Sequence, residues 1–156
     1  MNDVKGLFNE TKIVEIEISY KPIVKQSQLP QILQPVDAYN ILRQLWDKDK
    51  IDFIEQFKVM LLNRNSRVLG ICAISTGSSA GTIADPKIIF SVAIRGNASG
   101  IIIAHNHPSG SLKPSENDYG LTERIKQCGR LLDVMVKDSI IITSEGYYSF
   151  AEEGAL

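Results

Sequence analysis

Apolar and polar residues alternate along the chain with two different periods, which predict strands and helices in turn. Strict alternation over residues 13–19 predicts an edge strand with one side in water. A second period-two stretch covers residues 51–63, and short apolar runs rich in β-branched residues predict further buried strands. These further strands are expected at residues 68–74, 100–104, 139–143 and 147–150.

Helical spacing of apolar residues is found in three other stretches. The first helix is expected to begin near Pro35 and to end at Asp47, and the second to run from the N-cap Asp85 to Gly96. A third helix is expected to follow Ser115 as its N-cap. Strands that alternate with helices indicate an α/β or α+β layered domain around one sheet. The residues expected on the buried sides of the helices are Ala38, Ile41, Leu42, Leu45 and Trp46, then Ile88, Ile89, Val92 and Ala93, and then Leu121, Ile125, Cys128 and Leu132.

Both histidines of the chain stand one residue apart at the end of a predicted strand. Side chains at positions i and i+2 of an extended chain point the same way, so His105 and His107 would converge while Asn106 turns aside. Asp118 lies three residues before Leu121 and continues the inward side of the third helix, where a carboxylate needs a partner. Two imidazoles and one carboxylate match a catalytic zinc site whose fourth position is open to water.

Each part of this pattern has a simpler explanation when it is taken alone. A Ser115-x-x-Asp118 pair is more often a helix capping box than part of a metal site. A lone buried histidine is more often a hydrogen-bonded core residue than a metal ligand. The complete spacing, H-x-H-x7-S-x2-D, favours the metal site over these alternatives.

The same spacing resembles the metal-binding signature of the JAB/MPN metalloenzymes, a family that includes zinc isopeptidases. The string His-Asn-His-Pro-Ser-Gly at residues 105–110, followed by Pro114 and Ser115, is similar to the RadC-like branch of that family. The resemblance implies a JAB/MPN fold, which is similar to cytidine deaminase, with one central mixed sheet flanked by helices. The domain would cover residues 36–156, and residues 1–35 would form an N-terminal extension with the edge strand. Zn²⁺ is the implied cofactor, with the two histidines and the aspartate as its ligands.

Glu55 interrupts an apolar row on one side of a predicted strand. A glutamate at a strand end is usually only a solvated residue, so the pattern alone does not assign it a role. The family resemblance does, because JAB/MPN enzymes carry a glutamate on an early strand that acts as general acid/base. The tripeptide at residues 55–57 also resembles the Glu-x-Phe of the RadC-like branch. The apolar row consists of Phe53, Phe57, Val59 and Leu61.

The reaction implied by this site is hydrolysis of a peptide or isopeptide bond by a metal-activated water. Glu55 would take a proton from that water and later deliver it to the leaving amine. Ser115 would donate a hydrogen bond to the oxyanion of the tetrahedral intermediate or hold its hydration shell, and a plain helix cap is the alternative role. The expected partner is therefore a peptide or protein substrate.

Bulk composition narrows the remaining possibilities. The 156 residues suit one domain with a sizeable core. The 17 basic and 18 acidic residues give a formal charge of −1, so DNA as a partner has no support from charge. No apolar run is long enough to span a membrane and the N-terminus lacks a signal-peptide pattern, so a cytoplasmic protein is expected. Cys72 and Cys128 lie in apolar patterns and are expected to be free core residues.

Other chemistries fit the chain less well. The glycine-rich loop at residues 76–81 lacks both phosphate-binding motifs, and the cysteine pair of nucleobase deaminases and the H-E-x-x-H of zincin proteases are absent. The remaining alternative is a DNA- or protein-binding module on a JAB fold that acts in DNA repair, as the RadC name implies. The chain departs from the family at two places. Residues 1–35 do not resemble the helix-hairpin-helix region of larger RadC-like proteins, and Asp138-Ser139 stands where many members have Asp-His.

Overall fold

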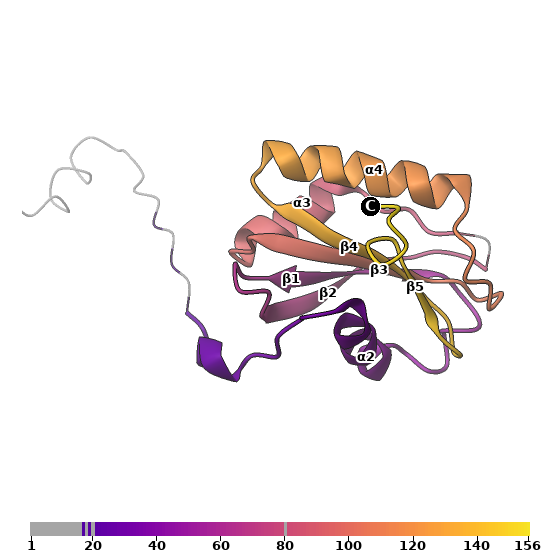
Figure 1. Ribbon diagram of the computed structural model, residues 1–156, viewed down its shortest axis with the longest axis horizontal. Coiled ribbons are helices and arrows are strands. Elements are labelled where there is room, and N and C mark those ends of the chain that lie inside the picture. Colours follow the sequence, from indigo (N-terminus) through magenta and orange to yellow (C-terminus); the bar gives the residue numbers. More distant parts are fainter. Residues whose placement is uncertain (1–16, 18, 20, 80) are drawn as a thin grey trace, which may run out of the picture.

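The computed structural model describes residues 17, 19, 21–79 and 81–156 of the chain. The edge strand predicted for residues 13–19 lies outside the described residues, apart from residues 17 and 19, which belong to no strand. The described part forms one mixed sheet with helices on both faces (Figure 1). This arrangement confirms the predicted α+β layered class with a central mixed sheet.

The sheet has five strands within the described part of the chain. The strands span Gln56–Leu62 (β1), Val68–Thr76 (β2), Gly100–Asn106 (β3), Met135–Ile142 (β4) and Tyr147–Ser149 (β5). Their spatial order is β2-β1-β3-β4-β5, and neighbours are antiparallel except for β3 and β4, which run parallel. A parallel pair needs a long crossover, and residues 107–134 provide it.

Helices cover both faces of the sheet (Figure 1). They span Gln26–Gln28 (η1, a 3-10 turn), Pro35–Leu45 (α2), Pro86–Arg95 (α3) and Glu116–Leu131 (α4). Alternate residues of β3 point to opposite faces, so Ile101 and Ile103 pack beneath α3 and α4, whereas Ile102 and Ala104 pack against α2. The sheet therefore separates two apolar clusters.

No helix within the described ranges is long and apolar enough to cross a bilayer.

Several smaller predictions are confirmed by local contacts. Asp85 caps α3, because its side chain accepts a hydrogen bond from the backbone N–H of Lys87 at 2.9 Å. Ser115 caps α4 in the same way. Cys72 and Cys128 are free thiols as expected, but both are only partly buried and pack at the margin of the apolar cluster beneath α3 and α4. The caps fix where the two helices begin, and α4 in particular begins at the end of the sheet where β3 ends.

Four residues predicted to lie on the buried side of a helix or strand are exposed, so the prediction is wrong for these four. Phe53 (68% exposed) lies in a turn before β1, and Leu132 (45%) lies beyond the last residue of α4. Neither residue therefore belongs to the strand or helix in which it was predicted. Leu45 (59%) is the last residue of α2. Ile88 (49%) points to solvent because the next residue, Ile89, occupies the packed side of α3.

The strand β4 begins at Met135, four residues before the predicted strand. Its first residues alternate, with Met135 and Lys137 exposed and Val136 and Asp138 buried. The prediction relied on the continuous apolar run at residues 139–143 and overlooked this alternation, because two of the four residues are charged. The parallel pairing with β3 begins at Gly100 opposite Met135 and holds the early residues in the strand.

Candidate metal centre

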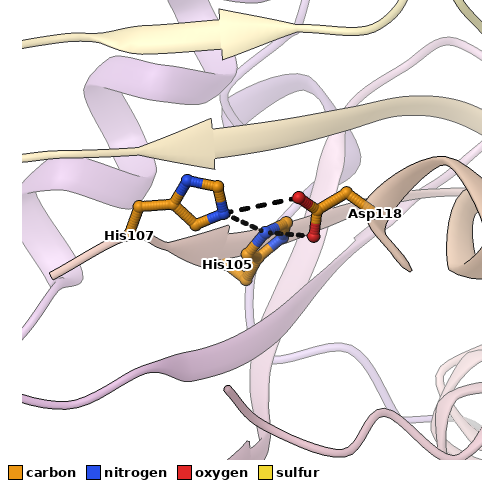
Figure 2. A group of neighbouring side chains, drawn as sticks. All are labelled: His105, His107 and Asp118. Carbon is orange, nitrogen blue, oxygen red and sulfur yellow. Dashed lines mark hydrogen bonds and ion pairs between the residues drawn. The ribbon is translucent and has the colours of Figure 1, made fainter. Parts of the chain in front are cut away.

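Strand β3 delivers the two histidines to one end of the sheet. His105 is an odd-numbered residue of β3, like Ile101 and Ile103, so its side chain is on the face of the sheet that α3 and α4 cover. It pairs with Phe57 of β1 and Ile141 of β4. His107 follows directly after the strand, and its backbone N–H still donates to the carbonyl of Ile142 at 3.0 Å. The chain therefore stays extended far enough for both imidazoles to converge, as the spacing predicted (Figure 2).

The beginning of α4 brings Asp118 to the same point. Its Oδ1 lies 3.0 Å from Nε2 of His105, and its Oδ2 lies 3.5 Å from Nε2 of His107. The two Nε2 atoms are 3.0 Å apart (Figure 2). One potential ligand atom from each of the three residues lies within 4.8 Å of the others. The structure thus brings together the three side chains predicted as ligands, in a cluster that could hold a metal ion.

The orientation of the His107 ring is fixed by a second contact. Its Nδ1 lies 2.8 Å from the backbone carbonyl oxygen of Ser111. A carbonyl oxygen only accepts hydrogen bonds, so Nδ1 carries the hydrogen and donates it. In the neutral ring this leaves the lone pair on Nε2, the atom that faces His105 and Asp118. A histidine whose far nitrogen donates to a carbonyl is the usual arrangement of a metal-ligating imidazole.

Electrostatic interactions within the cluster keep Asp118 ionised. Burial raises the pKa of its carboxyl group, but the hydrogen bonds with His105 and His107 lower that pKa to well below its ordinary value. The hydrogen bond with Asp118 in turn raises the pKa of His107, against the effect of burial. The carboxylate thus attracts positive charge to this point. A bound cation would take the place of the imidazole protons as its partner.

Glu55 lies immediately before β1 and lines the same pocket as His105, His107 and Asp118, the three potential ligands that we call the metal cluster. This pocket has a volume of about 500 Å³. Its backbone is held on both sides, since its N–H donates to the carbonyl of Ser78 at 2.9 Å and its carbonyl accepts from the N–H of Gly77 at 2.8 Å. Burial raises the pKa of the Glu55 carboxyl group, and the nearby His105 and His107 oppose this effect. The glutamate predicted from the family resemblance therefore shares a pocket with the predicted ligands.

Ser115 contacts the carboxylate of Asp118 twice. Its hydroxyl donates to Oδ2 of Asp118 at 2.7 Å, and its backbone N–H donates to the same oxygen at 2.6 Å. The serine Oγ also accepts a hydrogen bond from the backbone N–H of Asp118 at 3.2 Å. The two residues form a reciprocal capping box, which orients the carboxylate toward the imidazoles. The catalytic role expected for Ser115 stays a prediction.

A model of the RadC-like JAB domain family matches residues 32–155, which include the metal cluster and Glu55. The chain belongs to this family. Family membership agrees with the layered fold and the position of the cluster at the end of β3. The domain boundary expected at residue 36 stays a prediction.

Three relatives illustrate the extent of the likeness. A UPF0758 protein of Flavobacterium johnsoniae is 39% identical over 127 residues, which are 81% of this chain and 54% of that protein. A UPF0758 protein of Thermotoga maritima is 44% identical over 102 residues, which are 65% of this chain and 46% of that protein. A UPF0758 protein of Rubrobacter xylanophilus is 36% identical over 162 residues, which cover 100% of this chain and 69% of that protein. The chain spans about half the length of the first two relatives.

One residue of the RadC-like motif that the sequence pattern left without a role is Asn106, between the two histidines. Its side chain points to the other face of β3 and is fully buried. The amide Nδ2 donates to the carbonyl oxygens of Ile51 at 2.7 Å and Ile54 at 2.9 Å, and Oδ1 accepts from the backbone N–H of Gln56 at 2.7 Å. Asn106 therefore holds the segment on both sides of Glu55. The only signal in the sequence was its position between the two histidines, where the alternation of an extended chain directs its side chain to the opposite face of the strand.

Ser139, at the position where the family resemblance leads us to expect a histidine, lies in β4 opposite Ile103 and is not one of the three potential metal ligands. Its buried Oγ accepts a hydrogen bond from the hydroxyl of Thr122 at 3.0 Å. Thr122 belongs to α4, four residues after Asp118, so this contact ties the helix to the sheet. Ser139 therefore contributes to the packing of the helix that carries one of the ligands.

Proposed function

We propose that this chain is a zinc-dependent hydrolase that cleaves a peptide or isopeptide bond. The observation that carries the proposal is the convergence of two imidazoles and one carboxylate within 4.8 Å, in a pocket that Glu55 also lines. Two histidines and one carboxylate make a donor set that is typical of catalytic zinc, with a fourth position left for water. Membership in the RadC-like JAB domain family agrees with this donor set.

The charge and the orientation of the proposed ligand residues favour the binding of a divalent cation. Asp118 is ionised, and the capping box with Ser115 aims its carboxylate at the imidazoles. The contact with the Ser111 carbonyl directs the lone pair of His107 to the same point. Zinc bound here would lower the pKa of a coordinated water to about 7 and polarise the carbonyl of the scissile bond.

Glu55 supplies the proton transfers in this proposal. Its carboxylate oxygen would accept a proton from the attacking water and then deliver that proton to the nitrogen of the leaving amine. Burial raises the pKa of this carboxyl group, which brings its basicity closer to that of the water it must deprotonate. The backbone contacts of Glu55 with residues 77 and 78 fix the segment that carries it.

Zinc content gives the first test. We expect His107→Ala to abolish stoichiometric zinc, measured by inductively coupled plasma mass spectrometry on purified protein. Lys113→Ala is the control, because Lys113 is exposed in the same loop and lies outside the metal cluster. Zinc that survives in the His107 variant at wild-type stoichiometry would reject the ligand assignment.

Catalysis gives the second test. A pool of peptides and ubiquitin-like isopeptide conjugates is incubated with the zinc-loaded protein, and new termini are identified by mass spectrometry. We expect Glu55→Gln to keep its zinc and to lower the cleavage rate by about 10²–10⁴-fold. Glu116→Gln is the control, because Glu116 is an exposed acidic residue near Ser115 that does not line the pocket. Equal cleavage by the Glu55 variant would remove this residue from the mechanism.

The alternative of a DNA-binding module in DNA repair has weaker support, because the formal charge of −1 provides little attraction for phosphates. A gel-shift assay with single-stranded and branched DNA at several salt concentrations separates the two functions. Tight binding with a steep salt dependence, together with no cleavage of any peptide or conjugate, would favour the binding module over the hydrolase.

A further inference from the structure

A second and larger pocket lies at the opposite end of the sheet from the metal cluster. It has a volume of about 790 Å³ and is formed where β1 ends, where β3 and β4 begin, and where α4 ends. The helix α4 runs along the sheet between these two ends (Figure 1). Seven residues of β3 separate them, which corresponds to about 20 Å. This second pocket shares no residue with the metal pocket.

Four of the twelve residues that line this second pocket are basic. Arg64, Lys126, Arg130 and Lys137 line it, and Asp133 is the one acidic residue among them. Lys126 pairs with a glutamate on its own helix. Among the residues described by the structure, no ion pair involves Arg64, Arg130 or Lys137. Three unpaired cations thus surround one cavity in a chain whose formal charge is −1.

Apolar groups form the other part of the wall. Ala98, Val134, Met135 and Val136 line the pocket together with the basic residues. A wall that is both cationic and apolar suits an organic anion better than a bare inorganic ion, because the apolar groups can cover the uncharged part of the ligand. The volume lies in the range of pockets for small molecules, which is about 300–1,000 Å³.

Backbone hydrogen bonds fix one wall of the pocket. The N–H of Val134 donates to the carbonyl of Gly129 at 3.0 Å, and the N–H of Met135 donates to the carbonyl of Ser99 at 3.1 Å. Asp133, directly before these two residues, adopts the left-handed conformation, with a φ of 54°. The turn between α4 and β4 is therefore fixed against the beginning of β3. A preformed wall loses less entropy when a ligand binds.

We propose that this pocket binds a small organic phosphate of nucleotide size. Arg64 and Arg130 would contact the phosphate oxygens, since guanidinium groups bind phosphate through paired hydrogen bonds. Lys137 adds a third positive charge for the second charge of a phosphate monoester. The apolar wall would receive the rest of the ligand. A nucleic acid fits less well, because the basic residues surround one cavity and do not follow an extended stripe.

Calorimetric titration of the full chain tests this proposal, with adenosine 5′-monophosphate as the probe. Adenosine and inorganic phosphate, titrated separately, report the two parts of that probe. We expect saturable binding of the monophosphate that is tighter than binding of either part. Amide shifts in a ¹H–¹⁵N spectrum of chelator-treated protein should map to residues such as Ser99, Gly129 and Lys137, and should leave His105 and His107 unchanged.

Charge variants identify the groups responsible. We expect Arg64→Gln and Arg130→Gln each to weaken binding by about tenfold, since each removes a charge-assisted hydrogen bond. Asp133→Asn should strengthen binding by about two- to fivefold, because it removes the one negative charge and asparagine tolerates the same φ. Arg124→Gln is the control, since Arg124 lies on the same helix but lines only the metal pocket.

The following results would overturn the proposal. The first is no saturable binding of the monophosphate, and the second is an affinity of the Arg64 and Arg130 variants that equals that of the wild type. The third is a set of amide shifts confined to the metal pocket. A ten-nucleotide single-stranded DNA that binds when the monophosphate does not would reassign the basic residues to a nucleic-acid surface.

Discussion

Oδ1 of Asn106 accepts a hydrogen bond from the backbone N–H of Gln56 at 2.7 Å, across 50 residues of sequence. Asn106 lies between two potential metal ligands, and Gln56 follows the predicted general base. The same amide group donates to the carbonyls of Ile51 and Ile54. One buried side chain therefore couples the strand of the histidines to the segment that carries Glu55. This coupling makes Asn106 a positioning residue for the proposed reaction.

Replacement of Asn106 by alanine should separate metal binding from hydrolysis. The change leaves one backbone N–H and two carbonyls without their buried partner, so we expect a loss of about 2–5 kcal/mol in the free energy of unfolding. Glu55 would lose its fixed position, and the cleavage rate should fall although zinc remains. Urea unfolding, zinc analysis and the cleavage assay measure the three effects.

Asn106→Asp provides the matched variant, because a carboxylate keeps the shape of the amide and still accepts from Gln56. It cannot donate to the carbonyls of Ile51 and Ile54, and it places a negative charge against them. We expect a loss of stability at neutral pH similar to that of the alanine variant. If both variants cleave substrate at the wild-type rate, Asn106 has no part in positioning Glu55.

Ser115→Ala tests whether the serine acts through Asp118 or on the substrate. The variant loses the hydroxyl that donates to Oδ2 of Asp118 and caps the helix. We expect a loss of about 1 kcal/mol in stability and a decrease of about 10–100-fold in zinc affinity, measured by competition with a chromogenic chelator. Ser115→Thr retains a hydroxyl and should stay close to wild type. Unchanged zinc affinity with a lower kcat would instead favour the oxyanion role.

The metal cluster could be predicted because each of its parts depends on a local period. The two-residue period of an extended chain places His105 and His107 together, and the helical period places Asp118 on the inward side of α4. The contact between strand end and helix start follows from the short loop between them. The role expected for Glu55 rests only on the family resemblance, because the spacing by itself leaves a strand-end glutamate ambiguous.

Contacts between distant segments could not be predicted in this way. The bonds of Asn106 join residues about 50 positions apart, and no period in the sequence encodes them. The basic pocket likewise depends on side chains such as Arg64 and Lys137, which come from different elements. The misplaced beginning of β4 has another cause, since the buried Asp138 interrupts the apolar pattern that marks a core strand.

Asp138 should make stability depend on pH. Burial raises the pKa of its carboxyl group above the ordinary value of 3.8, although the hydroxyl of Ser149 and the N–H groups of Ala151 and Ser139 donate to it and oppose this effect. Between the two pKa values the folded chain binds more protons than the unfolded chain. The contribution of Asp138 to the free energy of unfolding is therefore largest below pH 3.8 and decreases as the pH rises through the raised pKa.

Asp138→Asn isolates this contribution, because asparagine does not titrate and can still accept from the two backbone N–H groups. The free energy of unfolding of the variant minus that of the wild type should increase as the pH rises from about 4 and then become constant. Urea unfolding at a series of pH values measures this difference. Asp52→Asn, at an exposed position, is the control. A difference that decreases with rising pH would show that the folded state favours the carboxylate.

Two glycines of α4 should respond to alanine in opposite directions. A Cβ at Gly129 would lie 2.3 Å from the backbone oxygen of Val134, whereas a Cβ at Gly120 would have no atom within 4 Å. Gly129→Ala must therefore push the end of α4 away from β4, and we expect a loss of about 1–3 kcal/mol in the free energy of unfolding. Gly120→Ala should add about 0.5–1 kcal/mol, because alanine favours the helix. Urea unfolding of both variants measures these changes in the free energy of unfolding. A Gly129 variant as stable as wild type would show that the turn at Asp133 is not held rigidly.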